Sequence, residues 1–254
     1  MNNVHSFLDE HARANPNLVV LRWVRPENLR NFKPGGILKH ESISMLELYE
    51  RIGHVAAGLK EIGIEKNDRV ILFVPMSLQL YTAMFALQKI GAIPVFLDSW
   101  ARSNHLGASA RSVAPKAMIS FEKAFALCAN VPELTRVSVK ICVGPAQHEY
   151  TARLEELLKT PAIASKEPVE QEHTALITFT TGSSGVPKGA DRTHRFLAAQ
   201  HYALHQCIPY VAGDVDLPVF PIFSLNNIAA GVSTVIPAFD IGLPEDRDLP
   251  GYAK

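Results

Sequence analysis

Hydroxyl groups, glycines and one lysine are concentrated in the segment TTGSSGVPKG, residues 180–189, which lies between two apolar stretches. Glycine permits close approaches that a Cβ atom would block, so the backbone amides of such a loop can turn toward phosphate oxygens. Threonine and serine hydroxyls add hydrogen-bond donors, and a lysine supplies a mobile positive charge. The segment therefore predicts a polyphosphate-binding loop formed by Thr180, Thr181, Gly182, Ser183, Ser184, Gly185 and Lys188.

Two common phosphate loops do not match this segment. The loop of nucleoside triphosphatases ends in Gly-Lys-Ser/Thr, whereas Lys188 follows Pro187 and precedes Gly189. The dinucleotide pattern G-x-G-x-x-G does not fit these glycines either. A plain Gly/Ser turn is the alternative, and the order of the residues makes it the weaker one.

Other residues that could do chemistry have simpler explanations. His201 and His205 have the spacing of a metal pair, but Tyr202 stands where the pattern H-E-x-x-H requires a glutamate, so we interpret them as a partly buried helix face. Asp98 follows an apolar stretch and is interpreted as a helix cap or turn residue. The cysteines are odd in number and widely spaced, which predicts reduced thiols and no metal site: Cys128, Cys142 and Cys207.

The elements that must position the loop are an expected strand over residues 173–180 and an expected helix over residues 193–206. A glycine-rich loop at the carboxyl end of a strand, ahead of a helix, lies where open α/β sheets usually bind ligands. In the first turn of that helix, His194 is expected to line a substrate site or to position the loop.

The N-terminal half alternates helical and strand patterns. Ser44 stands three residues before Glu47, which is the capping-box spacing, and apolar residues then recur at helical intervals. An apolar strand at 68–75, a helical pattern at 77–90 and a second strand at 92–98 follow. Continuous apolar strands alternating with helices predict an α/β fold with mostly parallel sheets flanked by helices.

Weaker forms of the pattern continue toward the loop. They predict helices at 101–113, 121–128 and 151–158, and strands at 116–120 and 139–144. Residues 160–173 are polar, carry two prolines and show no period, so we expect an exposed connector there.

The composition is that of an ordinary globular protein. Of 254 residues, 47% are hydrophobic, and 25 basic side chains balance 25 acidic ones. No overall field therefore draws the chain to nucleic acid or to an anionic membrane, and a small-molecule substrate is expected. The N-terminus lacks the apolar run of a secretory signal, and no stretch offers the ~20 apolar residues of a membrane span, so we expect a cytoplasmic protein without a transmembrane segment.

The order Thr-Thr-Gly-Ser-Ser-Gly-Val-Pro-Lys-Gly at 180–189, followed by Thr193 and His194, resembles the phosphate loop of the adenylate-forming (AMP-binding) enzyme superfamily. The order of the N-terminal elements is also similar to the start of the large domain of these enzymes. The resemblance covers residues 1–240, which it implies are N-terminal subdomains of an AMP-binding domain. The tail 241–254 has no clear assignment.

Within the superfamily, the stretch DLPVFPIFSLNNIAAGVSTVIPAFD, residues 216–240, is most similar to fatty-acyl members and especially to the β-lactone synthetases of olefin biosynthesis. Acyl-CoA synthetases of this superfamily commonly carry a histidine or an aromatic residue near the position of Ser224. This chain has a serine there, which puts the usual gate of the acyl pocket in doubt. The resemblance implies substrate contacts by His194, Phe223, Ser224 and Leu225.

The resemblance implies the cofactors ATP and Mg²⁺. Such enzymes join a fatty or hydroxy-fatty carboxylate to the α-phosphate of ATP and release pyrophosphate, and the acyl-CoA ligases then use CoA. Their loop holds the β- and γ-phosphates and then the departing pyrophosphate.

The family's downstream motifs for adenine, magnesium and ribose, and its small C-terminal domain with a catalytic lysine, are not found before Lys254. No catalytic residue is therefore assigned, and the chain by itself is expected to be inactive. The alternative is a non-catalytic nucleotide- or acyl-binding module derived from the family. The sequence leaves the acyl length, the product and the oligomeric state open.

Overall fold

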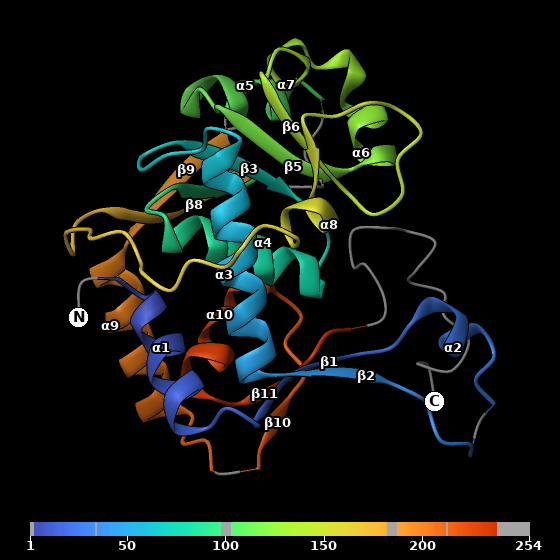
Figure 1. Cartoon of the computed structure of the whole chain (residues 1–254), viewed down its shortest axis with the longest axis vertical. Helices are drawn as coiled ribbons and strands as arrows, with labels where there is room; N and C mark the ends of the chain where they lie inside the picture. Colours follow the sequence, from blue (N-terminus) through green and yellow to red (C-terminus); the bar gives the residue numbers. More distant parts are fainter. Residues whose placement is uncertain (1–2, 34, 98–102, 182–186, 212, 238–254) are drawn as a thin grey trace.

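The computed structural model describes residues 3–33, 35–97, 103–181, 187–211 and 213–237, and their strands form two sheets (Figure 1). The larger sheet has the order β7-β6-β5-β3-β4-β8-β9. Its strands are β3 (Arg69–Phe73), β4 (Ile93–Phe96), β5 (Ala117–Phe121), β6 (Val139–Val143), β7 (Ala152–Arg153), β8 (Thr174–Thr181) and β9 (Pro187–Thr193). All neighbouring pairs are parallel except β8 and β9, which confirms the expected class of mostly parallel α/β fold.

The second sheet has four short strands in the order β10-β11-β1-β2. Its strands are β1 (Val19–Trp23), β2 (Glu41–Ser44), β10 (Val215–Asp216) and β11 (Ser233–Val235). Strand β11 pairs in parallel with both β1 and β10, and β2 is antiparallel to β1. This sheet was not predicted from the sequence, because it joins the two ends of the described chain and no local pattern indicates such a pairing.

Helices cover the two sheets. They are α1 (His5–Ala14), α2 (Pro26–Arg30), α3 (Met45–Glu61), α4 (Leu78–Lys89), α5 (Ser103–Val113), α6 (Glu122–Leu127), α7 (Pro132–Thr135), α8 (Leu154–Leu157), α9 (His194–Cys207) and α10 (Pro221–Ala230), with a short 3₁₀ turn at Cys128–Asn130.

The predicted capping box of α3 is confirmed. The Ser44 hydroxyl accepts a hydrogen bond from the Glu47 amide at 3.3 Å, and the Ser44 amide donates to the Glu47 carboxylate at 2.8 Å. Gly63, with a φ of +86°, follows the end of the helix.

The core joins both sheets. A single cluster of buried hydrophobic side chains extends from Val4 to Ile236 and includes Leu21 of the smaller sheet and Leu72 of the larger one. Helices α3 and α4 contribute many of its members, and α3 runs from the larger sheet to the smaller one in Figure 1. The position of the β8–β9 end of the larger sheet is therefore linked to the smaller sheet through packed side chains.

Two expectations about the middle of the chain were wrong, and a third holds only in part. Residues 151–158 form the two-residue strand β7 and a single turn, α8, in place of one helix. Residues 160–173 have no regular structure, as expected, but they are not simply exposed, because Val169 is buried and the Glu167 amide donates to the Lys89 carbonyl at 2.7 Å. The phosphate-loop segment does not lead directly into a helix, because β9 lies between it and α9.

Candidate functional site

The loop segment forms the end of an antiparallel hairpin between β8 and β9. The register places Lys188 opposite Thr180, Pro187 opposite Thr181 and Gly189 opposite Phe179. Pairing therefore brings the two ends of the predicted phosphate loop side by side, although they are several residues apart in the sequence.

The hairpin lies at a sheet edge suited to ligands. Strand β8 is parallel to β4, with Ile177 opposite Val95 and Thr178 opposite Phe96, so the loop leaves the edge at which the parallel strands end. That edge is the usual position of ligand sites in open α/β sheets. Lys188 is exposed there. The predicted loop residues Gly182, Ser183, Ser184 and Gly185 lie outside the described residues, as does Asp98, and of Thr180 and Thr181 the structure describes only the strand backbone.

A phenylalanine that the sequence analysis did not single out supports the hairpin. A Cβ atom on Gly189 would lie 3.2 Å from two ring atoms of Phe179, so the glycine lets this buried ring lie against β9. Across the same hairpin, Arg192 donates to the Thr178 hydroxyl at 3.3 Å, and the Thr174 hydroxyl donates to Asp191 at 3.0 Å. The signal in the sequence is the position of Phe179 at the end of the apolar part of β8, directly before Thr180.

His194 begins helix α9 directly after the hairpin. The Thr193 hydroxyl caps this helix by accepting a hydrogen bond from the Phe196 amide at 3.1 Å. The His194 side chain is 2% exposed, and its Nδ1 atom accepts a hydrogen bond from the Val4 amide at 3.1 Å. Its ring stacks on His173 with 5.7 Å between centroids, and burial lowers its pKa to about 4. The neutral ring therefore ties the N-terminal segment to the base of the hairpin, and its contact with substrate stays a prediction.

The three predicted acyl-site residues of α10 have different environments. Phe223 is 43% exposed, Leu225 is buried against the core, and Ser224 is fully buried. Burial raises the pKa of Tyr81 on α4, and the nearby Ser224 hydroxyl partly opposes that rise. Within the described part of the chain, neither hydroxyl makes a hydrogen bond of normal geometry. The buried hydroxyls of Tyr81 on α4 and Ser224 on α10 thus lack normal hydrogen bonds, which is uncommon in a protein core.

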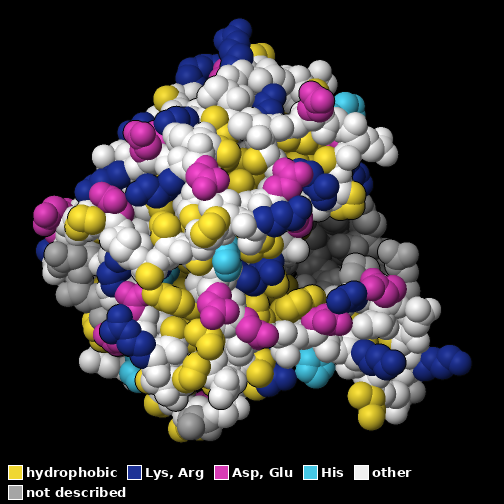
Figure 2. Space-filling model, viewed as in Figure 1, with side chains coloured by type: hydrophobic (Ala, Val, Ile, Leu, Met, Phe, Trp, Pro, Cys, Tyr) yellow, Lys and Arg dark blue, Asp and Glu magenta, His cyan; other side chains and the backbone are white. Residues whose placement is uncertain are grey.

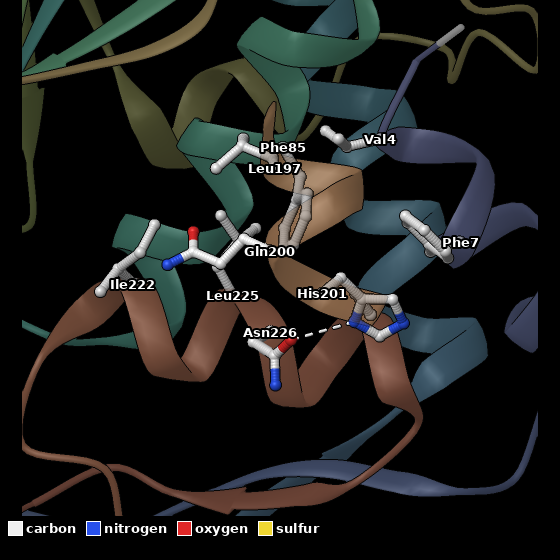
Figure 3. Close-up of a pocket in the computed structure, with 10 residues that line it drawn as sticks. Val4, Phe7, Phe85, Leu197, Gln200, His201, Ile222, Leu225 and Asn226 are labelled. Carbon is white, nitrogen blue, oxygen red and sulfur yellow. Dashed lines mark hydrogen bonds between the residues drawn. The ribbon is translucent and has the colours of Figure 1, made fainter. Parts of the chain in front are cut away.

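A small cavity lies next to this pair, where α1, α4, α9 and α10 meet (Figure 3). It is lined by Val4, Phe7, Phe85, Leu197, Gln200, His201, Ile222, Leu225, Asn226 and Ala229. Its volume of about 30 Å³ has room for one or two water molecules. In this form of the structure, the cavity is therefore too small for an acyl chain.

Of the two histidines of α9, His201 is partly buried and used in packing, whereas His205 is exposed. His201 Nδ1 lies 3.0 Å from the Asn226 side-chain oxygen, as the dashed line in Figure 3 shows, and its ring contacts Phe7 with 4.5 Å between centroids. Over the described residues, no group of three or more His, Cys, Asp or Glu side chains could hold a metal ion. The cysteines are free, with Cys128 and Cys142 buried and Cys207 exposed.

A search of the described helices found none long and apolar enough to cross a membrane.

Comparison with protein-family models gives a match over residues 8–240 to the family described as AMP-binding enzyme. An olefin β-lactone synthetase from Stenotrophomonas maltophilia is 30% identical over 252 residues, which are 97% of this chain and 44% of that protein. An acetyl-coenzyme A synthetase from Methanothrix thermoacetophila is 27% identical over 210 residues, 76% of this chain and 31% of that protein. The chain thus spans less than half the length of these curated relatives.

Solved structures show the same fold. A long-chain-fatty-acid-CoA ligase from Archaeoglobus fulgidus superposes with a TM-score of 0.77 at 22% identity, covering 92% of this chain and 46% of that one. An O-succinylbenzoate coenzyme A synthetase from Bacillus subtilis, in complex with ATP and magnesium ion, gives a TM-score of 0.71 at 15% identity over 93% of this chain and 57% of that one.

Proposed function

The chain belongs to the family of AMP-binding enzymes, and from that premise we propose that it supplies the phosphate-binding part of an ATP-dependent acyl-activating enzyme. In this reaction a fatty or hydroxy-fatty carboxylate attacks the α-phosphate of Mg-ATP, an acyl-adenylate forms and pyrophosphate leaves. The activated acid then gives a thioester with CoA or closes to a β-lactone, with AMP released. The olefin β-lactone synthetase and the acetyl-coenzyme A synthetase among the relatives support these two outcomes.

The β8–β9 hairpin is the observation that carries the proposal. Its register brings Thr180 opposite the exposed Lys188 at the sheet edge where ligands bind, with the loop glycines between them in the sequence. A lysine and open backbone amides suit the β- and γ-phosphates and the departing pyrophosphate. The lysine charge and the amide dipoles are in place before the reaction, so these groups need not reorganise when pyrophosphate leaves. Magnesium would be bound to these phosphates when ATP enters the site.

We place the acyl chain along α10, near Phe223, Ser224 and Leu225, with His194 at the start of the neighbouring helix. The apolar lining of the cavity beside Leu225 supports this position. Because its volume is only about 30 Å³, entry of a chain there requires α10 to move away from α9. A small side chain at Ser224 would leave room for a bulky or branched acid.

In the proposal, residues 1–240 are N-terminal subdomains of the AMP-binding domain and residues 241–254 carry no assigned role. The chain covers 44% of its β-lactone synthetase relative, which supports an adenylation site completed by residues outside these 254. We propose that the 254 residues alone do not complete adenylation and that the protein works in the cytoplasm.

Pyrophosphate exchange into ATP tests the proposal. The complete protein is expected to catalyse exchange that depends on a fatty or 3-hydroxy-fatty acid, and Lys188→Ala is expected to lower the rate by about 10²-fold. Lys159→Ala, at an exposed lysine outside the hairpin, serves as the matched control and should leave the rate unchanged. Absence of exchange with every chain length, or equal rates for the two variants, would contradict the proposal.

A non-catalytic binding module is the second candidate. It is favoured by the short coverage of the relatives together with a retained phosphate loop. Binding of ATP or of an acyl chain by the complete protein, without exchange for any acid, would select this candidate over the first.

A further inference from the structure

Residues 24–40, here called the basic arm, leave the smaller sheet between β1 and β2 and carry the short helix α2. The arm projects from the body of the molecule, at the right of Figure 1. The arm connects two strands of the smaller sheet, whereas the β8–β9 hairpin belongs to the larger sheet. The arm is therefore outside the site described above.

Internal contacts give the arm a defined shape. The Asn28 side chain donates to the Lys39 carbonyl at 3.3 Å, and an ion pair of 3.1 Å joins Arg25 to Glu41 at the start of β2. The Gly36 amide donates to the Lys33 carbonyl at 3.0 Å and closes a turn. The start and the middle of α2 are thus connected to the segment that returns to the sheet.

The arm concentrates positive charge in a chain whose formal net charge is zero. The arm contains four basic side chains and one acidic side chain, a net charge of +3: Arg25, Arg30, Lys33 and Lys39 against Glu27. Glu41 is already paired with Arg25. The exposed ammonium groups of Lys33 and Lys39 have no acidic partner among the residues that the structure describes. This local excess is not visible in the balanced charge of the whole chain.

Two apolar side chains are exposed beside these lysines. Ile37 is 96% exposed and Phe32 is 40% exposed. Figure 2 shows hydrophobic, basic and acidic side chains together on the projecting part at its lower right. Exposed apolar side chains flanked by lysines are typical of segments that bind the interface of a bilayer, because the apolar groups enter the headgroup region while the ammonium groups stay with the phosphates.

We propose that the basic arm docks the protein onto an anionic lipid surface. Ile37 and Phe32 enter the headgroup region, and Lys33 and Lys39 bind the lipid phosphates. A soluble polyanion or a nucleic acid would use the same charges but would leave Ile37 in water, so the pairing of charge with apolar exposure favours the bilayer. The inference does not depend on the proposed enzymatic activity.

Co-sedimentation with lipid vesicles tests the proposal. The full chain is expected to bind vesicles that contain phosphatidylglycerol and to bind pure phosphatidylcholine vesicles much less, with binding that weakens as salt is added. Replacing both lysines, Lys33→Gln with Lys39→Gln, is expected to lower the apparent affinity about thirtyfold, and Ile37→Ser about tenfold. The matched control, Lys123→Gln with Lys159→Gln, changes the net charge equally at two exposed lysines outside the arm.

The outcomes separate the possible occupants of the arm. Loss of vesicle binding in both arm variants, with the control unaffected and all far-ultraviolet circular dichroism spectra unchanged, is the expected result. Equal losses in the arm and control double variants would show that only net charge matters and would overturn the proposal. Retention on heparin without any vesicle binding would assign the arm to a soluble polyanion and would overturn it as well.

Discussion

His194 is the residue at which the hairpin, helix α9 and the N-terminal segment meet. Its Nδ1 atom can accept the hydrogen bond from the Val4 amide only while that nitrogen carries no proton. Burial lowers its pKa from 6.5 to about 4, so the ring is neutral at physiological pH. The residue therefore combines a structural contact with a defined sensitivity to acid.

We predict that His194 makes the protein less stable in weak acid. The unfolded chain binds a proton near pH 6.5 and the folded chain only near pH 4, so this contribution to stability is complete above pH 6.5 and is lost as the pH falls toward 4. At pH 5 the loss amounts to about 2 kcal/mol. Urea unfolding between pH 7 and pH 5 measures it.

His194→Asn is the informative variant, because the asparagine oxygen can accept the Val4 hydrogen bond but does not titrate. The difference in stability between pH 7 and pH 5 is expected to shrink by that amount. Other histidines with lowered pKa values that do not stack on His194, such as His5 and His201, titrate in both proteins and cancel in the comparison. An unchanged pH dependence would show that His194 is not the responsible group.

Helix α3 depends on a glycine for its contact with α8. A Cβ atom on Gly58 would lie 2.8 Å from the Leu157 Cβ and 3.0 Å from its Cα. Because one of these atoms belongs to the backbone, a rotamer change cannot relieve the overlap, and the two helices would have to separate.

We predict that Gly58→Ala destabilises the protein by about 1–3 kcal/mol through overpacking. Helix propensity alone predicts the opposite sign, a gain of about 1 kcal/mol for replacing glycine in a helix interior. The midpoint of urea unfolding decides between them. A higher midpoint in the variant would mean that α3 and α8 are not in close contact at Gly58 and Leu157.

At the scale of helices and strands, the sequence predicted those elements that have a clear helix cap or a continuous apolar run. Helix α3 follows from its capping box and its glycine stop, and β3 and β4 follow from continuous apolar runs. Strand β9 was missed because its sequence, PKGADRT, has poor strand propensity and forms a strand only by pairing with β8. The phosphate loop could be identified from residue order alone, whereas the support from Phe179 and the tie from His194 to Val4 depend on non-local contacts.

At the scale of the whole molecule, one hydrophobic cluster is shared by both sheets, and a second cluster packs on the larger sheet. Strand β1 comes from the N-terminal part of the chain and its neighbour β11 from the end of the described part, so the smaller sheet closes the chain on itself. Such an arrangement favours cooperative unfolding of the two sheets over independent unfolding of each sheet.

We predict that a core substitution in the smaller sheet weakens the larger one. Leu21→Ala removes a fully buried side chain from β1 and is expected to cost about 2–5 kcal/mol. Native-state hydrogen exchange should then show an equal loss of protection for the slowest amides of β1, β3 and β5. A loss confined to β1 and its neighbours would show that the sheets unfold separately.

Titration of the ¹⁵N-labelled chain with Mg-ATP, followed by amide chemical shifts, tests whether the β8–β9 hairpin binds phosphate, because it reports weak binding residue by residue. We predict that the largest shifts fall on residues 180–189, and that Lys188→Ala lowers the affinity about tenfold while Lys159→Ala leaves it unchanged. Shifts centred elsewhere, or shifts that persist equally in Lys188→Ala, would contradict the assignment of the β8–β9 hairpin as the phosphate site.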